Sequence, residues 1–140
     1  MNIPELIHKA IAAREFAYAP YSNFCVGAAL LTKSGKIYTG CNVENAGYSA
    51  TNCAERTAFF KAVYDGCYDF AAIAVVGGPA GKPVQAQDEP SGPCGVCRQV
   101  MQEFCGPDFE IHMQKAGGGV FTVKLPELLP FGFTKDSMEA

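Results

Sequence analysis

The sequence predicts a layered α/β fold in one domain spanning residues 1–140, and three observations support this. The 140 residues are 49% apolar and 18% charged, which is globular composition in a chain long enough for one hydrophobic core. Segments with helical spacing and short apolar runs follow one another in the order α-β-β-α-β-α-β-β. The strand–helix–strand alternation after residue 36 implies crossover connections, which are typical of layered α/β sheets.

The first half of the chain contains four predicted elements. Apolar residues recur with helical spacing over residues 3–18, and the Ala-Pro pair that follows ends this helix. Residues 24–31 and 36–42 are apolar, flank the turn sequence TKSG, and so predict a β-hairpin. A second helix is expected over residues 53–64, ending before Gly66.

The second half adds a buried strand, a helix and a strand pair. Residues 70–78 form a short apolar run bounded by glycines, which favours a buried strand. A helix is expected over residues 95–104, where the Gly-Pro pair beyond it stops the pattern. Strands are expected over residues 109–113 and 120–124, and residues 125–130 (LPELLP) predict a last helical turn.

Composition disfavours several classes of function. The net charge is −3 and no stretch is rich in Lys and Arg, so the chain lacks the basic patch that a nucleic-acid-binding protein normally uses. No apolar run approaches the roughly 18 residues of a membrane helix. The N-terminus lacks a secretory signal, so we expect a cytoplasmic protein whose seven cysteines are reduced and available for metal binding or catalysis.

A C-x-x-C motif lies at the start of the helix predicted over residues 95–104. Cys94 and Cys97 are three residues apart, which places both sulfurs on one helix face. The unpaired N–H groups and dipole of a helix start favour thiolate, the form that binds zinc. A redox dithiol uses the same geometry, so this motif alone leaves zinc binding and thiol redox chemistry both open.

A third cysteine favours the metal interpretation. Cys53 also lies at a predicted helix start, and three thiolates converging on one point would bind zinc with one coordination position left for water, the catalytic arrangement. A closed structural zinc would need a fourth ligand. The remaining cysteines fit better as small apolar core or surface residues; they are Cys25, Cys41, Cys67 and Cys105.

Glu55, two residues after Cys53, has two compatible interpretations. Asn52 and Glu55 have the spacing of a capping box, in which Glu55 would only stabilise the helix start. Alternatively, a carboxylate held rigidly in the first helical turn could serve as general base to a metal-activated water and then as acid to a leaving group.

The motifs together resemble those of the small zinc-dependent cytidine deaminases. The resemblance rests on CAE (53–55) and PCGVC (93–97), and it extends over most of residues 18–63, 93–104 and 128–133. It implies a three-layer α-β-α fold around a mixed five-stranded sheet. It also implies hydrolytic deamination of free cytidine and deoxycytidine, one zinc ion per subunit, and a homotetramer with pockets shared between subunits.

The resemblance assigns roles to individual residues. Cys53, Cys94 and Cys97 would bind zinc, Glu55 would carry protons between water, the base and ammonia, and Arg56 would offset the negative charge of the thiolates. The nucleoside would be bound by Phe24 against the ring, the backbone of Ala54 at the base edge, and Asn42, Glu44 and Tyr48 at the sugar, with Phe133 closing the pocket of a neighbouring subunit.

Two features depart from the family pattern. Phe131 is an extra aromatic residue beside Phe133, and the loop over residues 77–92 is longer than expected. Three other hypotheses make different predictions. A polynucleotide deaminase conflicts with the acidic charge, a zinc-stabilised binding module would bind the metal without catalysis, and a thiol oxidoreductase would form a Cys94–Cys97 disulfide without metal.

Overall fold

The computed structural model describes residues 1–84, 92–114 and 119–139. These residues form five strands and four α-helices, with two short 3₁₀ segments. In chain order the elements are α1 (Ile3–Arg14), β1 (Phe24–Thr32), β2 (Ile37–Cys41), η1 (Tyr48–Ala50), α2 (Ala54–Tyr64), β3 (Phe70–Pro79), α3 (Gly95–Phe104), β4 (Glu110–Gln114), β5 (Val120–Lys124), α4 (Leu125–Leu128) and η3 (Lys135–Met138).

The five strands form one mixed sheet in the order β2-β1-β3-β4-β5. β3 and β4 are parallel, with Ile73 opposite Ile111, whereas the other neighbouring pairs are antiparallel. The two connections that bracket β3 run through α2 and α3. Both helices therefore begin beside the same sheet, and this places residues 53 and 94 close together.

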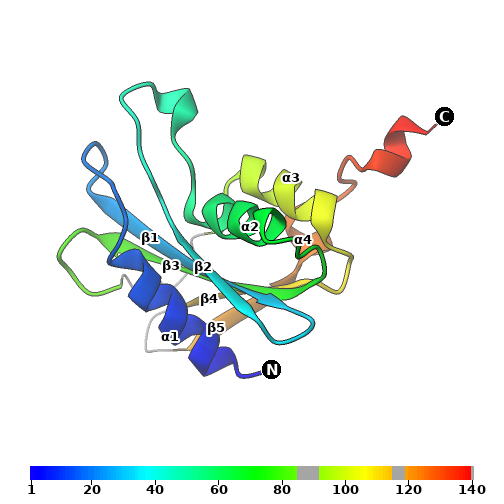
Figure 1. Ribbon diagram of the computed structural model, residues 1–140, viewed down its shortest axis with the longest axis horizontal. Coiled ribbons are helices and arrows are strands. Elements are labelled where there is room, and N and C mark those ends of the chain that lie inside the picture. The colour runs from blue at the N-terminus through cyan, green and yellow to red at the C-terminus, as the bar shows by residue number, and fades with distance from the viewer. Residues whose placement is uncertain (85–91, 115–118, 140) are drawn as a thin grey trace.

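Helices cover both faces of the sheet, as Figure 1 shows, with α1 on one side and α2, α3 and α4 on the other. The larger core cluster lies on the α2 side around Phe59, whose ring packs on Phe70 and Phe109 at centroid distances of 5.1 and 6.1 Å. The smaller cluster lies under α1 and includes Leu6 and Ala74. The predicted three-layer fold with a mixed five-stranded sheet is confirmed.

Two glycines allow helices to approach the sheet very closely. A Cβ at Gly27 would lie 1.9 Å from the carbonyl oxygen of Ala10 in α1. A Cβ at Gly40 would lie 2.4 Å from the carbonyl oxygen of Ala54 in α2. Only a residue without a side chain fits at these contacts, so Gly40 fixes the distance between β2 and the first turn of α2.

The prediction for the first helix was too long. α1 ends at Arg14 rather than near residue 18, and its last carbonyls accept from the N–H groups of Glu15 and Phe16 in a tighter turn. Tyr18 instead forms an isolated β-bridge with Val43. Tertiary pairing therefore overrides the apolar spacing at this end. The remaining predicted helices and strands are confirmed, with boundaries differing by one or two residues.

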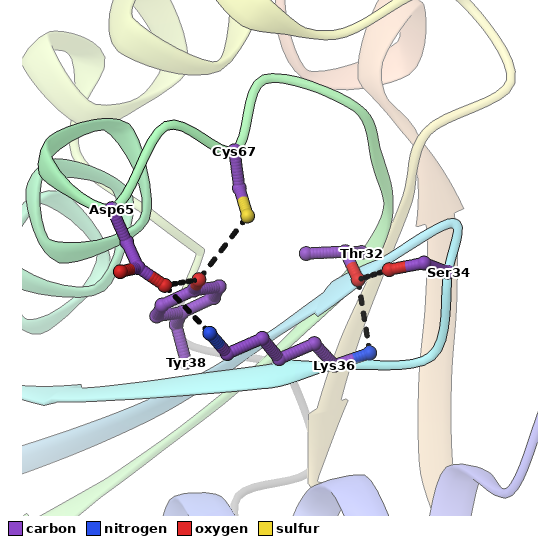
Figure 2. Close-up of polar contacts among 6 residues, drawn as sticks. All are labelled: Thr32, Ser34, Lys36, Tyr38, Asp65 and Cys67. Atoms are coloured by element: carbon purple, nitrogen blue, oxygen red, sulfur yellow. Dashed lines mark hydrogen bonds and ion pairs between the residues drawn. The ribbon is translucent and has the colours of Figure 1, made fainter.

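A polar cluster ties the β1–β2 hairpin to the end of α2 (Figure 2). The Asp65 carboxylate, which follows α2, accepts from Lys36 Nζ at 2.6 Å and from the Tyr38 hydroxyl. The Tyr38 oxygen also lies 3.1 Å from the sulfur of Cys67. The hydrogen bond to Asp65 raises the pKa of Tyr38 to about 12, and that from Lys36 lowers the pKa of Asp65.

None of the helices in the described part of the chain has the length and apolar character needed to cross a membrane. The longest of them, α1, has 12 residues.

Candidate active site

Three cysteine sulfurs meet where α2 and α3 begin. Cys53 and Cys94 are the N-cap residues of the two helices, and Cys97 lies in the first turn of α3. The sulfurs of Cys53 and Cys94 are 3.7 Å apart, and those of Cys94 and Cys97 are 3.4 Å apart. All three sulfurs lie within 4.8 Å of one another. Among the described residues, these three cysteines form a group of side chains that could bind one metal ion.

The geometry of this cluster fits a zinc ion. Zinc–sulfur bonds of about 2.3 Å in a tetrahedral site place the sulfurs roughly 3.8 Å apart, close to the separations found here. Neither N-cap cysteine makes a side-chain capping bond. Their sulfurs are therefore not used for helix capping, and they remain available as metal ligands.

The three thiols ionise unequally. Hydrogen bonding from Cys97 lowers the pKa of Cys53 to about 5 against the effect of burial, with help from Arg56 and Cys94. The same hydrogen bond raises the pKa of Cys97, and burial raises it further. One thiolate is thus stabilised by the remaining S–H groups. A bound cation would be needed to ionise all three.

Glu55 is buried beside the cluster, with 4% of its surface exposed. Burial raises the pKa of its carboxyl, and the charge of the Cys53 thiolate raises it further. Hydrogen bonds from its own backbone N–H and from Cys97 oppose the rise. A raised pKa makes the carboxylate a better proton acceptor, which suits general acid–base chemistry.

The capping-box interpretation of Glu55 is wrong. Cys53, not Asn52, is the N-cap residue, so Glu55 is the second residue of the helix and lacks the capping-box position. Asn52 instead donates through Nδ2 to the hydroxyl oxygen of Thr57 at 3.1 Å. The Thr57 hydroxyl contacts the carbonyl oxygens of Cys41 at 3.0 Å and Cys53 at 3.2 Å. Thr57 therefore joins the end of β2 to the backbone of Cys53.

Arg56 makes the contact with a thiol that the resemblance implied. Its Nη2 donates to the sulfur of Cys53 and to the carbonyl oxygen of Thr51, each at 3.4 Å. Its Nε is buried and has no hydrogen-bond partner among the described residues. The guanidinium therefore lies against the sulfur cluster rather than in solvent, and it can withdraw charge from the Cys53 thiolate.

A cavity of about 400 Å³ opens in front of these groups. This volume falls in the range of small-molecule sites. The lining is mainly apolar and includes several polar side chains. Its lining residues are Ser22, Phe24, Val26, Asn42, Glu44, Thr51, Asn52, Cys53, Ala54, Glu55, Val75, Val76, Gly77, Val84, Gly92, Cys94, Met113 and Gln114.

Phe24 forms part of the apolar wall. A Cβ at Gly77 would lie 2.8 Å from the edge of the Phe24 ring, so the glycine provides the space that this ring occupies. Because β1 and β3 are adjacent, with Val26 opposite Gly77, the ring is held between two neighbouring strands.

The polar residues predicted at the sugar end are already engaged with the backbone. Asn42 accepts from the N–H of Val26 at 2.8 Å and donates to the carbonyl of Phe24 at 2.9 Å. Glu44 accepts from the N–H groups of Tyr21 and Ser22 and from the Ser22 hydroxyl. The Ser22 bonds lower the pKa of Glu44. Both side chains are thereby fixed in orientation at the cavity.

Two residues expected at the pocket lie outside the cavity lining of their own chain. Tyr48 is 78% exposed and packs edge-to-face against Tyr21 at a centroid distance of 6.4 Å. Phe133 is 58% exposed beyond α4. Phe131 is fully exposed and has a positive φ of 55°. Residues 85–91 of the long loop lie outside the described residues.

The other cysteines are distributed away from the cluster. Burial raises the pKa of Cys41, and it raises that of Cys105 to about 12, as expected for thiols in apolar surroundings. Cys67 contacts Tyr38. In the part of the chain that the structure describes, no fourth cysteine joins the metal cluster.

Three further residues, Ser22, Thr57 and Gly77, shape the site without belonging to any motif in the sequence. Ser22 and Thr57 act through hydrogen bonds to groups more than ten residues away, and Gly77 through the space that it leaves for Phe24. The only indication in the sequence was that Ser22 and Thr57 lie close in the chain to predicted site residues.

Known proteins are similar to this chain over nearly its whole length. Residues 2–113 match the family described as the cytidine and deoxycytidylate deaminase zinc-binding region. A cytidine deaminase of Sporosarcina psychrophila is 48% identical over 138 residues, which cover 99% of this chain and 96% of the relative. A cytidine deaminase of Halalkalibacterium halodurans is 49% identical over 138 residues, covering 99% and 98%.

A crystal structure of cytidine deaminase from Burkholderia pseudomallei has the same fold. It matches with a TM-score of 0.84 at 50% identity, covering 95% of this chain and 100% of that one. The matched family region includes all three cysteines of the cluster and Glu55.

Proposed function

This chain belongs to the family of cytidine and deoxycytidylate deaminases, and we propose that it hydrolyses free cytidine and 2′-deoxycytidine to the uracil nucleosides and ammonia. The observation that carries the proposal is a cluster of three sulfurs beside a buried carboxyl, at a cavity that Cys53, Cys94 and Glu55 line. The mainly apolar lining suits a nucleobase, and the polar lining residues suit the hydroxyls of a sugar.

Cys53, Cys94 and Cys97 would hold the zinc ion. In a three-ligand site with an open position, zinc lowers the pKa of water toward about 7 and so supplies the nucleophile at neutral pH. The position of the cluster at two helix starts favours thiolates as its ligands. A closed binding module is less consistent with the cluster, because it needs a fourth ligand.

Glu55 would move the protons. Its carboxylate would take one proton from the attacking water and deliver it to N3 of the base. It would then take the second proton from the hydroxyl added at C4 and give it to the amine, which leaves as ammonia as the C4 carbonyl forms. The raised pKa supports this role, because it makes the Glu55 carboxylate a stronger base than an ordinary carboxylate. Burial also excludes solvent protons from the transfer.

The cavity residues would orient the nucleoside. Phe24 would pack on the pyrimidine and the Ala54 backbone would contact the base edge. Asn42 and Glu44 would bind the sugar hydroxyls with the hydrogen-bonding capacity that their backbone contacts leave free. Such fixed groups place C4 against the nucleophile without reorganisation during the reaction.

We also propose that the chain works as a homotetramer. Tyr48 and Phe133 lie outside their own cavity, and the segment that carries Phe133 extends away from the body of the molecule (Figure 1). Exposed aromatic side chains on projecting segments suit contacts with another copy. Phe133 would then close a neighbour's cavity.

Free nucleosides are more consistent substrates than polynucleotides. The chain has a net charge of −3, whereas a polynucleotide-binding surface requires clustered cations. All seven cysteines are free thiols, which supports our proposal of a reducing, cytoplasmic location.

One assay tests the function directly. Purified chain is mixed with cytidine or deoxycytidine, and the loss of cytosine absorbance and the release of ammonia are followed with and without a zinc chelator. We expect both substrates to be deaminated, about one zinc per chain, and loss of activity on chelation that added zinc reverses. A Cys94→Ser variant should lose zinc and activity, whereas Cys105→Ser should keep both. Zinc-containing chain that leaves both nucleosides unchanged would refute the proposal.

A further inference from the structure

Arg98 lies one residue after the predicted zinc ligand Cys97 and holds two carbonyl groups. Its Nε donates to the carbonyl oxygen of Pro93 at 2.7 Å, and its Nη1 donates to that of Leu128, also at 2.7 Å. Pro93 is buried and directly precedes Cys94. One guanidinium therefore fixes the peptide that leads into a sulfur of the cluster and the end of α4.

The neighbouring Gln99 holds the chain beyond α4. Its Nε2 donates to the carbonyl oxygen of Phe133 at 2.9 Å. We call residues 129–139 the C-terminal arm. A Cβ at Gly132 in this arm would lie 3.2 Å from the side chain of Gln102, so the arm passes close to α3. Figure 1 shows the arm continuing outward beyond α3 and α4.

These contacts connect the sulfur cluster and the arm through one helix. Cys94 and Cys97 lie at the start of α3. Of the next two residues, Arg98 binds Leu128, directly before the arm, and Gln99 binds Phe133 within it. A planar guanidinium addresses two acceptors in fixed directions, which a lysine ammonium on a flexible stem does not reproduce. The link therefore depends on arginine and not only on positive charge.

We propose that Arg98 is a positioning residue that couples the zinc-ligand turn to the C-terminal arm. This inference rests on the proposed zinc site. An ordered α3 start presents Cys94 with its sulfur in place and holds Arg98 where it binds Leu128. The coupling is reciprocal, because an equilibrium effect of zinc on the arm requires an equal effect of the arm on zinc affinity.

The first test compares zinc release from matched arginine variants of the zinc-loaded chain. Release is followed with an excess of a chromogenic chelator. Arg98→Met should accelerate it at least about tenfold, the size of effect that residues supporting metal ligands typically have. Arg98→Lys should give an intermediate rate, because one of the two carbonyl contacts can be recovered.

Arg14 provides the control. Like the half-buried Arg98, the buried Arg14 binds backbone carbonyls: it donates to those of Cys25, Pro79 and Lys82 at 3.1, 2.6 and 2.7 Å without touching the cluster. Arg14→Lys should lower the melting temperature and leave zinc release unchanged. This comparison separates a specific effect on the metal from a general loss of stability.

The second test measures the reciprocal effect by hydrogen exchange of the arm amides. Removal of zinc from the wild-type chain should speed exchange over residues 129–139, and this response should shrink in Arg98→Met. A chain that ends at residue 127, and so lacks both Leu128 and the arm, should release zinc faster than the full chain. Wild-type zinc release in Arg98→Met or Arg98→Lys, or an arm indifferent to zinc, would overturn the inference. A wild-type chain that binds no zinc would refute the proposed function itself.

Discussion

Replacement of Gly40 by alanine should damage the active site more than the fold. The added Cβ would lie 2.4 Å from the carbonyl oxygen of Ala54 and 2.6 Å from the nitrogen of Ala58. Both atoms belong to the backbone of α2 and cannot rotate away. An ordinary contact needs about 3.4 Å, so the start of α2 must retreat by roughly 1 Å.

This retreat moves Cys53, Ala54 and Glu55 together, because they form the start of α2. A misplacement of about 1 Å at a catalytic group costs on the order of 10²-fold in rate. Crowding a packed interface costs about 1–3 kcal/mol, which for a chain of this size lowers the melting temperature by about 3–12 °C. We therefore expect kcat/KM for cytidine to fall about 100-fold in a protein that still folds.

The assay combines cytidine turnover, thermal melting and zinc content. Gly106→Ala is the matched control, because a Cβ there meets nothing within 4 Å and the residue has no positive φ. The control should match wild type in all three measurements. A Gly40→Ala chain with wild-type kcat/KM and melting temperature would show that the contact between β2 and α2 does not position the site.

Four further predictions follow from the same structure. Glu55→Gln should retain zinc but lose at least about 10³-fold in kcat, because more than one proton transfer is removed; kcat within tenfold of wild type would refute the shuttle role. Arg56→Ala should slow turnover and shift the acidic limb of the pH–kcat profile upward with zinc retained, since the contact of Arg56 Nη2 with Cys53 is lost; an unchanged profile would exclude tuning of the metal. Phe133→Ala should raise KM more than it changes the melting temperature, and a fully active monomer in sedimentation experiments would contradict the shared pocket. Asp65→Asn should lower the melting temperature near pH 7. Because the folded-state pKa of Asp65 is lowered, its contribution to stability is present above the unfolded-state pKa, which is near 4, and is lost as the pH falls through the folded-state pKa. A melting temperature lowered equally at all pH values would count against the cluster in Figure 2.

The sequence was informative where the signal is local. The C-x-x-C spacing placed two sulfurs on one helix start, and alternation of strand and helix patterns placed α2 and α3 beside one sheet. Two predicted helix starts suggested that Cys53 meets Cys94, and the family resemblance supported this pairing of residues 41 positions apart. Local patterns specify an element, whereas the meeting of two elements depends on topology.

The sequence-based predictions that were wrong concern residues whose partners are distant in the sequence. The helical spacing up to residue 18 was correct as a pattern, but Tyr18 pairs with Val43 instead. The capping box at Asn52 was plausible from spacing, but Thr57 provides Asn52 with another partner. Ser22 supports Glu44 across 22 positions. Competition between a local and a tertiary hydrogen bond is decided by packing, which one sequence does not display.

The separation of the metal ligands along the chain has a consequence for biosynthesis. At about 5–20 residues per second, the 41 positions from Cys53 to Cys94 take roughly 2–8 s to synthesise. During this interval Cys53 is present without the other two sulfurs of the cluster. The complete three-sulfur site can form only after Cys97 has also been synthesised and α3 has docked beside the sheet. Metal binding is therefore a late event that follows the assembly of both helix starts.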